Sequence, residues 1–228
     1  MKVRFPVDFW WGGATSGPQN EGRFHKPHVN VFDYHYDTKP EDFFRYVGPD
    51  VASDFYHLYE SDIALFKDLG FISLRTSIQW TRLIDDLEEG SLNPEGVAYY
   101  NRVIDALLAA GIRPIINLHH FDLPIELYER YGGWESKHVV ELFVKFARRA
   151  FECFGDRVTD WMTFNEPMVV VEGQYLYGFH YPMLVDGKKA VQVAYNLQLA
   201  SAKAIQAYRQ INQNPQGRVT IALNLTPA

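Results

Sequence analysis

The triplet Asn165-Glu166-Pro167 contains the side chain best suited to acid–base chemistry in this sequence. Proline has no N–H to donate to a strand ladder, so pairing is expected to end directly after Glu166. The side chains of Asn165 and Glu166 can then both reach the end of the strand, whereas an uninterrupted strand would send them to opposite faces. A carboxylic acid held in a water-poor pocket can protonate a leaving oxygen near neutral pH. The structural alternative is an acid paired with a nearby arginine.

Polar side chains also stand at the carboxyl ends of the other apolar runs in the sequence. In a (β/α)₈ barrel these ends converge on one mouth, which is where such enzymes place their active sites. Hydrogen-bonding groups with one arginine and few lysines suit a neutral polyhydroxylated ligand, such as a sugar, better than a phosphate. The residues concerned are Gln19, Glu21, Arg75, Ser77, His119, His120, Asp122 and Asn224.

Strand-like and helix-like runs alternate along the whole sequence, which predicts an α/β fold with a parallel sheet. We expect a TIM (β/α)₈ barrel that is incomplete, with about five βα units in a single domain over residues 1–228. An open doubly wound sheet fits the same rhythm, but the first turn lacks the G-x-G-x-x-G arrangement of that fold. The predicted strands are 9–15, 71–78, 112–118, 157–164 and 218–225, and the predicted helices are 52–69, 94–110, 138–154 and 188–211, with a loop over 167–186.

Composition limits the kinds of partner that the protein is expected to bind. The formal net charge is −6, and the 22 lysines and arginines are scattered, so neither nucleic acid nor a membrane surface is expected as a partner. The single cysteine, Cys153, is typical of a reducing compartment, and the start of the sequence lacks a secretory apolar segment. These features predict a cytoplasmic protein that binds a small molecule.

The pair His119-His120 raises the question of a metal site. Neighbouring residues of a strand point to opposite faces, and no third ligand lies at a suitable spacing. The sequence therefore predicts neither a metal nor another cofactor. We expect His120 to face the ligand and His119 to pack within the wall of the barrel.

Several motifs together resemble family 1 of the glycoside hydrolases, the β-glucosidase family. Thr163-Phe164-Asn165-Glu166-Pro167 is similar to the acid/base motif of that family, and the other matching segments follow in the family's order over nearly the whole sequence. They are Phe9 to Glu21-Gly22, Arg75 to Arg82, Leu118 to Pro124, and Gly132-Gly133-Trp134.

The resemblance implies a role for each matching residue in a retaining β-glycosidase. Glu166 is expected to be the general acid and then the general base, and Asn165 to bind the sugar 2-hydroxyl. Gln19 and His120 are expected to bind more remote hydroxyls of the same sugar. Arg75 is expected to orient the nucleophilic carboxylate. Phe121 stands where many members of the family have tryptophan.

The nucleophile of this family is a glutamate on the seventh strand, and only five strands are expected here. The isolated chain is therefore expected to be inactive, with the remainder of the barrel as its partner; the oligomeric state stays open. The segments 16–19 and 47–52 resemble the branch that hydrolyses 6-phospho-β-glucosides, so the expected substrate is a β-glucoside with or without a phosphate at O6. The alternative from another class is a non-catalytic sugar-binding barrel protein.

Overall fold

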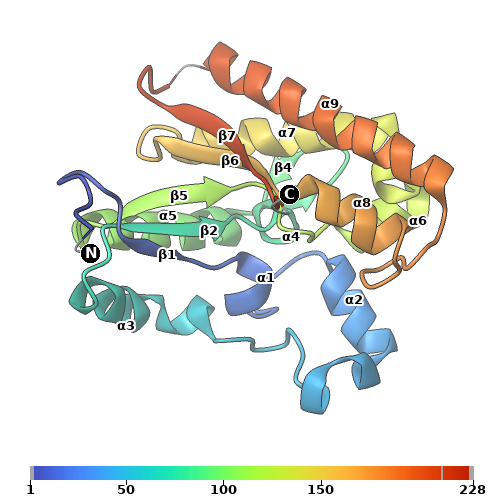
Figure 1. The fold of residues 1–228 in the computed structure, drawn as a ribbon, viewed down its shortest axis with the longest axis horizontal. Helices are drawn as coiled ribbons and strands as arrows, with labels where there is room; N and C mark the ends of the chain where they lie inside the picture. Colours follow the sequence, from blue (N-terminus) through green and yellow to red (C-terminus); the bar gives the residue numbers. More distant parts are fainter. Residues whose placement is uncertain (1–2, 212, 226–228) are drawn as a thin grey trace.

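The computed structural model describes residues 3–211 and 213–225, and its centre is a five-stranded sheet in which every neighbouring pair is parallel. The arrows of this sheet point toward the region where the short helices α1 (Gly17–Asn20), α4 (Trp80–Leu83) and α8 (Pro167–Tyr175) gather (Figure 1). The predicted α/β architecture with an incomplete barrel is confirmed. In spatial order the strands are β1 (Gly12–Ala14), β2 (Ser73–Ser77), β5 (Arg113–Asn117), β6 (Asp160–Asn165) and β7 (Arg218–Ala222).

Long helices alternate with these strands, at the positions that the apolar periodicity predicts. Asn93 caps the second of them through a hydrogen bond that its side chain accepts from Glu95 N, and Pro94 occupies the first turn. The first helix begins later than predicted, because Ala52 and Asp54 have φ angles of 54° and 55°, outside the helical region. The four are α3 (Phe55–Asp68), α5 (Pro94–Ala109), α7 (Lys137–Phe154) and α9 (Gly187–Ile211).

The buried face of α7 contributes much of the core between the sheet and the helices. Phe143, Phe146, Phe151 and Phe154 on this helix are almost completely buried, and Phe146 stacks on the ring of Trp80 with centroids 5.2 Å apart. Burial of each such ring contributes roughly 1.5–3 kcal/mol to folding. This packing holds the sheet against α7, so the carboxyl ends of the strands are held in fixed positions.

Shorter elements lie in segments for which the sequence predicted only loops. The prediction of a loop over 167–186 is wrong at its start, because Pro167 opens a helix that continues to Tyr175. The first strand is also shorter than predicted, since Phe9, Trp10 and Trp11 precede it. The additional elements are α1 (Gly17–Asn20), α2 (Val31–Thr38), α4 (Trp80–Leu83), α6 (Ile125–Tyr131), α8 (Pro167–Tyr175), the antiparallel strands β3 (Ile84–Asp86) and β4 (Ser91–Leu92), and 3₁₀ turns at Pro40–Asp42, Phe44–Tyr46 and Gly133–Glu135.

The sheet does not close within residues 3–211 and 213–225. The strand β1 pairs only with β2, and β7 pairs only with β6, so both outer strands keep an unpaired edge. Among these described residues, no helix combines the length and the apolar character that crossing a membrane would require.

Candidate active site

Glu166 lies at the point where β6 gives way to α8. Its backbone is left-handed, with φ 48° and ψ 61°, and its N–H donates to the carbonyl of Ala222 on β7 over 2.8 Å. A non-glycine residue in this conformation costs on the order of 1–3 kcal/mol, and such strain is concentrated at functional sites. Pro167 then begins α8, where its missing N–H costs nothing. The turn leaves the half-buried Glu166 side chain at the carboxyl end of the sheet.

Arg75 and Asn165 meet across the same end of the sheet, although β5 lies between their strands. The Arg75 guanidinium donates through Nη1 to Oδ1 of Asn165. The Asn165 side chain is buried, so this bond fixes its amide with the NH₂ group free to donate to a ligand. Burial lowers the pKa of Arg75, while the charge of Glu166 acts in the opposite direction, so Arg75 also lies within electrostatic reach of Glu166.

His120 follows β5 and contributes a neutral imidazole to the site. Burial, followed by the charge of Arg75, lowers the pKa of His120 to about 4. Its Nδ1 is buried and has no hydrogen-bond partner among the described residues, while the ring itself lines a cleft. The next residue, Phe121, has a left-handed φ of 68°, and this turn directs the chain away from the strand.

Gln19 stands on α1 and, like His120, lines a cleft of about 530 Å³. The Ser16 hydroxyl donates to Oε1 of Gln19 over 2.7 Å, which leaves the Gln19 NH₂ group to donate to a ligand. The cleft also has aromatic walls, in which Phe121 is joined by Phe32, Phe43 and His180, three residues that sequence reasoning missed. These come from segments far apart in the sequence, and no local pattern predicts their meeting. Among the residues that the structure describes, no lysine or arginine lines this cleft.

Glu21 was expected near the mouth with Gln19, but the structure assigns it to a buried polar network. Its Oε2 accepts hydrogen bonds from Arg82 Nε at 2.9 Å, Gln79 Nε2 at 2.8 Å and the Tyr100 hydroxyl at 3.1 Å. Arg82 also donates to the carbonyl of Gly22 over 3.1 Å. With all these partners, Glu21 holds the segment after α1 in place and is not available as a nucleophile.

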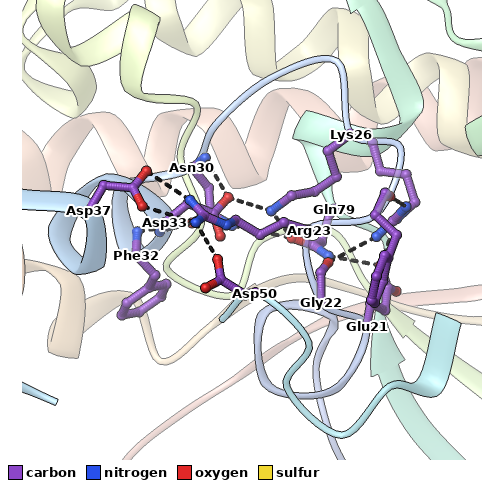
Figure 2. Close-up of polar contacts among 12 residues, drawn as sticks. Glu21, Gly22, Arg23, Lys26, Asn30, Phe32, Asp33, Asp37, Asp50 and Gln79 are labelled. Atoms are coloured by element: carbon purple, nitrogen blue, oxygen red, sulfur yellow. Dashed lines mark hydrogen bonds and ion pairs between the residues drawn. The ribbon is translucent and has the colours of Figure 1, made fainter. Parts of the chain in front are cut away.

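The same network extends to α2 through Gln79 (Figure 2). The Oε1 atom of Gln79 accepts from Asn30 Nδ2 at 3.2 Å and from Lys26 Nζ at 3.4 Å. Lys26 forms an ion pair with Asp33, and both side chains are almost completely buried. Asn30 and Asp33 cap the start of α2 reciprocally. The long segment between β1 and α3 is thus tied to β2 and α4 by buried polar contacts, which position the cleft wall that it supplies.

Asp122 lies beside this network, two residues after His120. Its Oδ1 accepts from the backbone N–H of His120 over 2.8 Å, so it holds the turn that presents His120. Burial raises the pKa of Asp122 to about 6, and nearby Lys26 opposes the increase. The carboxyl group is therefore engaged in positioning His120.

His119 packs within the wall, in agreement with the expectation from the sequence. Its Nδ1 accepts from the N–H of Phe121 at 3.3 Å, and its ring lies 5.2 Å from the rings of both Trp134 and Phe164. Burial lowers the pKa of His119 to about 3, so the ring is neutral. Within the described part of the chain, no group of three or more histidine, cysteine, aspartate or glutamate residues could hold a metal.

The family of the chain follows from comparison with known proteins. The model of Glycosyl hydrolase family 1 matches residues 1–228. The chain belongs to this family. Over the whole chain it is 48% identical to 6-phospho-β-glucosidase GmuD of Bacillus subtilis strain 168, and it covers 48% of that protein. Over 96% of the chain it is 39% identical to β-glucosidase 26 of Oryza sativa subsp. japonica, of which it covers 45%.

Solved structures give the same assignment for the fold. An aphid myrosinase matches 96% of this chain with a TM-score of 0.90 and 34% identity, and the match covers 48% of the myrosinase. The rice β-glucosidase Os3BGlu6 matches 97% of the chain with a TM-score of 0.91 and 34% identity, and the match covers 49% of that enzyme. The family 1 chain described here therefore spans about half the length of the relatives it matches.

The structure does not bring all the predicted site residues together. Asn165 and Arg75 touch, and Glu166 adjoins them. Gln19 and His120 both line the cleft. Asn224 lies beyond the end of β7 and is exposed, so it is not held at the sheet as the other residues are.

Proposed function

We propose that this chain supplies the acid/base half of a retaining β-glycosidase that acts on β-glucosides. The observation that carries the proposal is Glu166, held in a strained turn beside Asn165, whose amide is fixed by Arg75. Glu166 protonates the leaving oxygen in the first step and removes a proton from water in the second. Asn165 donates its free N–H to the sugar 2-hydroxyl, a contact that strengthens toward the transition state.

A second carboxylate must complete this mechanism at about 5 Å from the first. Glu21 is bound by Arg82, and Asp122 holds the turn at His120, so neither serves as the nucleophile. We place the nucleophile in a polypeptide that completes the barrel, with Arg75 as the cation that orients it. A rice Os3BGlu6 mutant described in a covalent complex with Glc, 33% identical to this chain, supports a covalent intermediate. By itself, the 228-residue chain is expected to be inactive.

Recognition of the sugar ring falls to Gln19, His120 and Asn165. Gln19 and His120 line the cleft and Asn165 ends β6, and the described residues that line the cleft carry no fixed charge. This chemistry suits the hydroxyls of a neutral sugar ring. Catalysis by two carboxyl groups requires no metal or organic cofactor.

The substrate proposed is a 6-phospho-β-glucoside, hydrolysed in the cytoplasm. Support comes from the name and the 48% identity of the Bacillus subtilis relative, a 6-phospho-β-glucosidase. Lysine and arginine are the side chains that commonly pair with a phosphate, and neither is among the described residues that line the cleft. The phosphate is therefore bound by the polypeptide that completes the barrel, whereas the unmodified part of the sugar is bound here.

The test uses a fusion of residues 1–228 to the part of GmuD that follows its matching half. We expect hydrolysis of p-nitrophenyl β-glucoside 6-phosphate in preference to p-nitrophenyl β-glucoside. The Glu166→Gln variant should lose deglycosylation and most turnover of substrates with a basic leaving group, because no acid protonates that group. It should still release 2,4-dinitrophenol in a first-turnover burst, since this leaving group needs no proton.

Glu172→Gln is the matched control, because it makes the same change on α8 at a residue that is not among those lining the cleft, and it should keep full activity. Equal activity of the Glu166→Gln variant and the parent fusion would disprove the assigned role. Turnover by the 228-residue chain alone that Glu166→Gln abolishes would disprove the assignment of the nucleophile to another polypeptide.

A non-catalytic sugar-binding protein remains the second candidate function, since one family member with 36% identity is named probable inactive β-glucosidase 14. The intact Asn165-Glu166 pair and its contact with Arg75 favour hydrolysis. Calorimetric titration of the fusion with β-glucoside distinguishes the two, because binding without turnover would support the non-catalytic function.

A further inference from the structure

The carboxyl end of β2 holds the short helix α1, which carries Gln19. The N–H of Gly17, the first residue of α1, donates over 2.8 Å to the hydroxyl oxygen of Ser77, the last residue of β2. Gly17 and Ser77 are both buried. The first N–H groups of a helix have no partner within the helix, so the Ser77 hydroxyl satisfies a buried donor that would otherwise be unpaired. One side chain of β2 thereby ties down the start of α1.

The side chain of Gln79 limits how closely α1 can approach β2. A Cβ atom at Gly17 would lie 2.5 Å from Cγ of Gln79, so α1 lies as close to this side chain as a glycine allows. Gln79 is completely buried, and its amide is held at both atoms: Nε2 donates to Glu21, and Oε1 accepts from Asn30 (Figure 2). It therefore cannot turn away from α1. The position of α1 is set by one hydrogen bond and one close contact.

Ser16 fixes the side chain of Gln19 on the helix that is placed in this way. Ser16 directly precedes α1 and is completely buried. Its carbonyl accepts from the N–H of Gln19 at 3.1 Å, and its hydroxyl donates to Oε1 of Gln19 at 2.7 Å. Because the amide oxygen is engaged, the NH₂ group is the part of Gln19 that can donate to a ligand.

Arg75 and Ser77 occupy alternate positions of β2, so their side chains leave the same face of the strand. Arg75 donates to the amide oxygen of Asn165, and Ser77 accepts from the N–H of Gly17. Asn165 and Gln19 are both expected to bind the sugar, and both take their positions from contacts with this one strand.

We propose that Ser77 and Ser16 are positioning residues for sugar recognition, in which Ser77 fixes α1 and Ser16 fixes the amide of Gln19. This rests on the proposed function, in which Gln19 binds a hydroxyl remote from the reacting bond. Ser77 is not among the described residues that line the cleft, so it acts through Gln19. A contact with a remote hydroxyl is made equally in the bound substrate and in the transition state. Its loss therefore raises KM more than it lowers kcat.

The first experiment measures steady-state kinetics of Ser77→Ala and Ser16→Ala in the fusion with GmuD. We expect the KM for p-nitrophenyl β-glucoside 6-phosphate to rise about 5- to 50-fold, with kcat within about twofold of the parent. When Gln19→Ala is already present, either serine substitution should change KM by less than about twofold, because the residue through which it acts is gone. Ser73→Ala is the matched control, since it removes the hydroxyl of a buried serine at the other end of β2, and it should keep the KM of the parent.

Two further variants separate the position of α1 from the serine hydroxyl and from folding. Gly17→Ala leaves Ser77 intact but displaces α1 through its contact with Gln79, and it should also raise KM. Ser77→Cys keeps nearly the volume of serine and offers only a weak acceptor, so it should raise KM even if the alanine variant does not fold. Calorimetric titration with p-nitrophenyl 1-thio-β-glucoside 6-phosphate, which resists hydrolysis, gives the same comparison of affinities without turnover.

The outcomes distinguish this proposal from the proposed function. Independent, multiplicative effects of Ser77→Ala and Gln19→Ala on KM and on affinity would overturn the positioning role, as would an equal loss in Ser73→Ala. Unchanged KM and affinity in the Ser77 and Gly17 variants would overturn it as well. A fusion that binds the thioglucoside with the expected pattern across the variants, but hydrolyses no β-glucoside, supports the positioning role and counts against the proposed function alone.

Discussion

The guanidinium of Arg75 on β2 donates a hydrogen bond to the amide oxygen of Asn165 at the end of β6, across the intervening strand β5. Arginine is always charged and Asn165 is buried, so this contact fixes which amide atom faces the mouth. The sugar-binding donor beside Glu166 is therefore positioned by a strand that is remote in sequence.

Arg75→Met should reduce kcat/KM of the fusion about 10- to 100-fold, because it leaves the buried Asn165 oxygen without a partner at a cost of about 1–3 kcal/mol. Steady-state kinetics with the chromogenic phosphorylated substrate measures the effect. Arg209→Met on α9 is the control and should behave like the parent. Unchanged kinetics in the Arg75 variant would show that Asn165 needs no such support.

Arg82→Met should destabilise the chain by about 3–5 kcal/mol, because it leaves the buried carboxylate of Glu21 without its cation. Urea denaturation followed by circular dichroism gives the free energy of unfolding. The double variant Glu21→Gln, Arg82→Met should recover part of the loss, because no unpaired charge remains. Arg102→Met, an exposed position on α5, should change stability by less than about 0.5 kcal/mol. A small effect of Arg82→Met would mean that water reaches Glu21.

Acid should destabilise the chain through His119, whose pKa burial lowers to about 3. The unfolded chain binds a proton at this histidine below about pH 6.5 and the folded chain does not, so stability falls as the pH decreases from about 6.5 toward 3. His119→Gln removes this contribution and should flatten the stability curve over that range, as measured by urea denaturation at successive pH values.

Asp122 contributes in the opposite sense, because its pKa is raised to about 6 and its protonated form is favoured in the folded state. The chain and its His119→Gln variant both retain Asp122, so the difference between their curves of stability against pH reports the contribution of His119. Parallel curves for the two proteins would contradict a buried neutral His119.

Gly96→Ala should destabilise the chain by about 1–3 kcal/mol, because a Cβ at this position would lie 2.1 Å from the backbone oxygen of Arg82. Backbone cannot move as a flexible side chain does, so α5 must shift away from α4. Thermal unfolding measures the loss. The control is Ala109→Gly at the end of α5, which changes helix propensity alone and should cost no more than about 1 kcal/mol. Gly111→Ala is unsuitable as a control, because the φ of Gly111 is 76° and alanine is strained there. A Gly96 variant as stable as the parent would show that the two helices pack loosely.

Much of the fold could be predicted from the sequence because its signals are local. The long helices have apolar residues at helical spacing, Asn93-Pro94 marks a helix start, and apolar runs mark the strands. Short elements such as α2 and α8 were missed, since their stability comes from capping and burial by distant segments. The same limit applies to the cleft, where Phe32 and His180 meet residues more than a hundred positions away.

The available chemistry can be read from the order of residues alone: a carboxylic acid between Asn165 and Pro167, and polar groups at successive strand ends. Which of these groups act together depends on the fold. Glu21 and Gln19 are two residues apart, yet one is buried against Arg82 and the other faces the cleft. Trp10 and Arg218 are neighbours only because the sheet curves. Each position of the sequence specifies a side chain, but whether that side chain is buried, and with which partner, depends on the strands and helices that pack against it from distant parts of the chain.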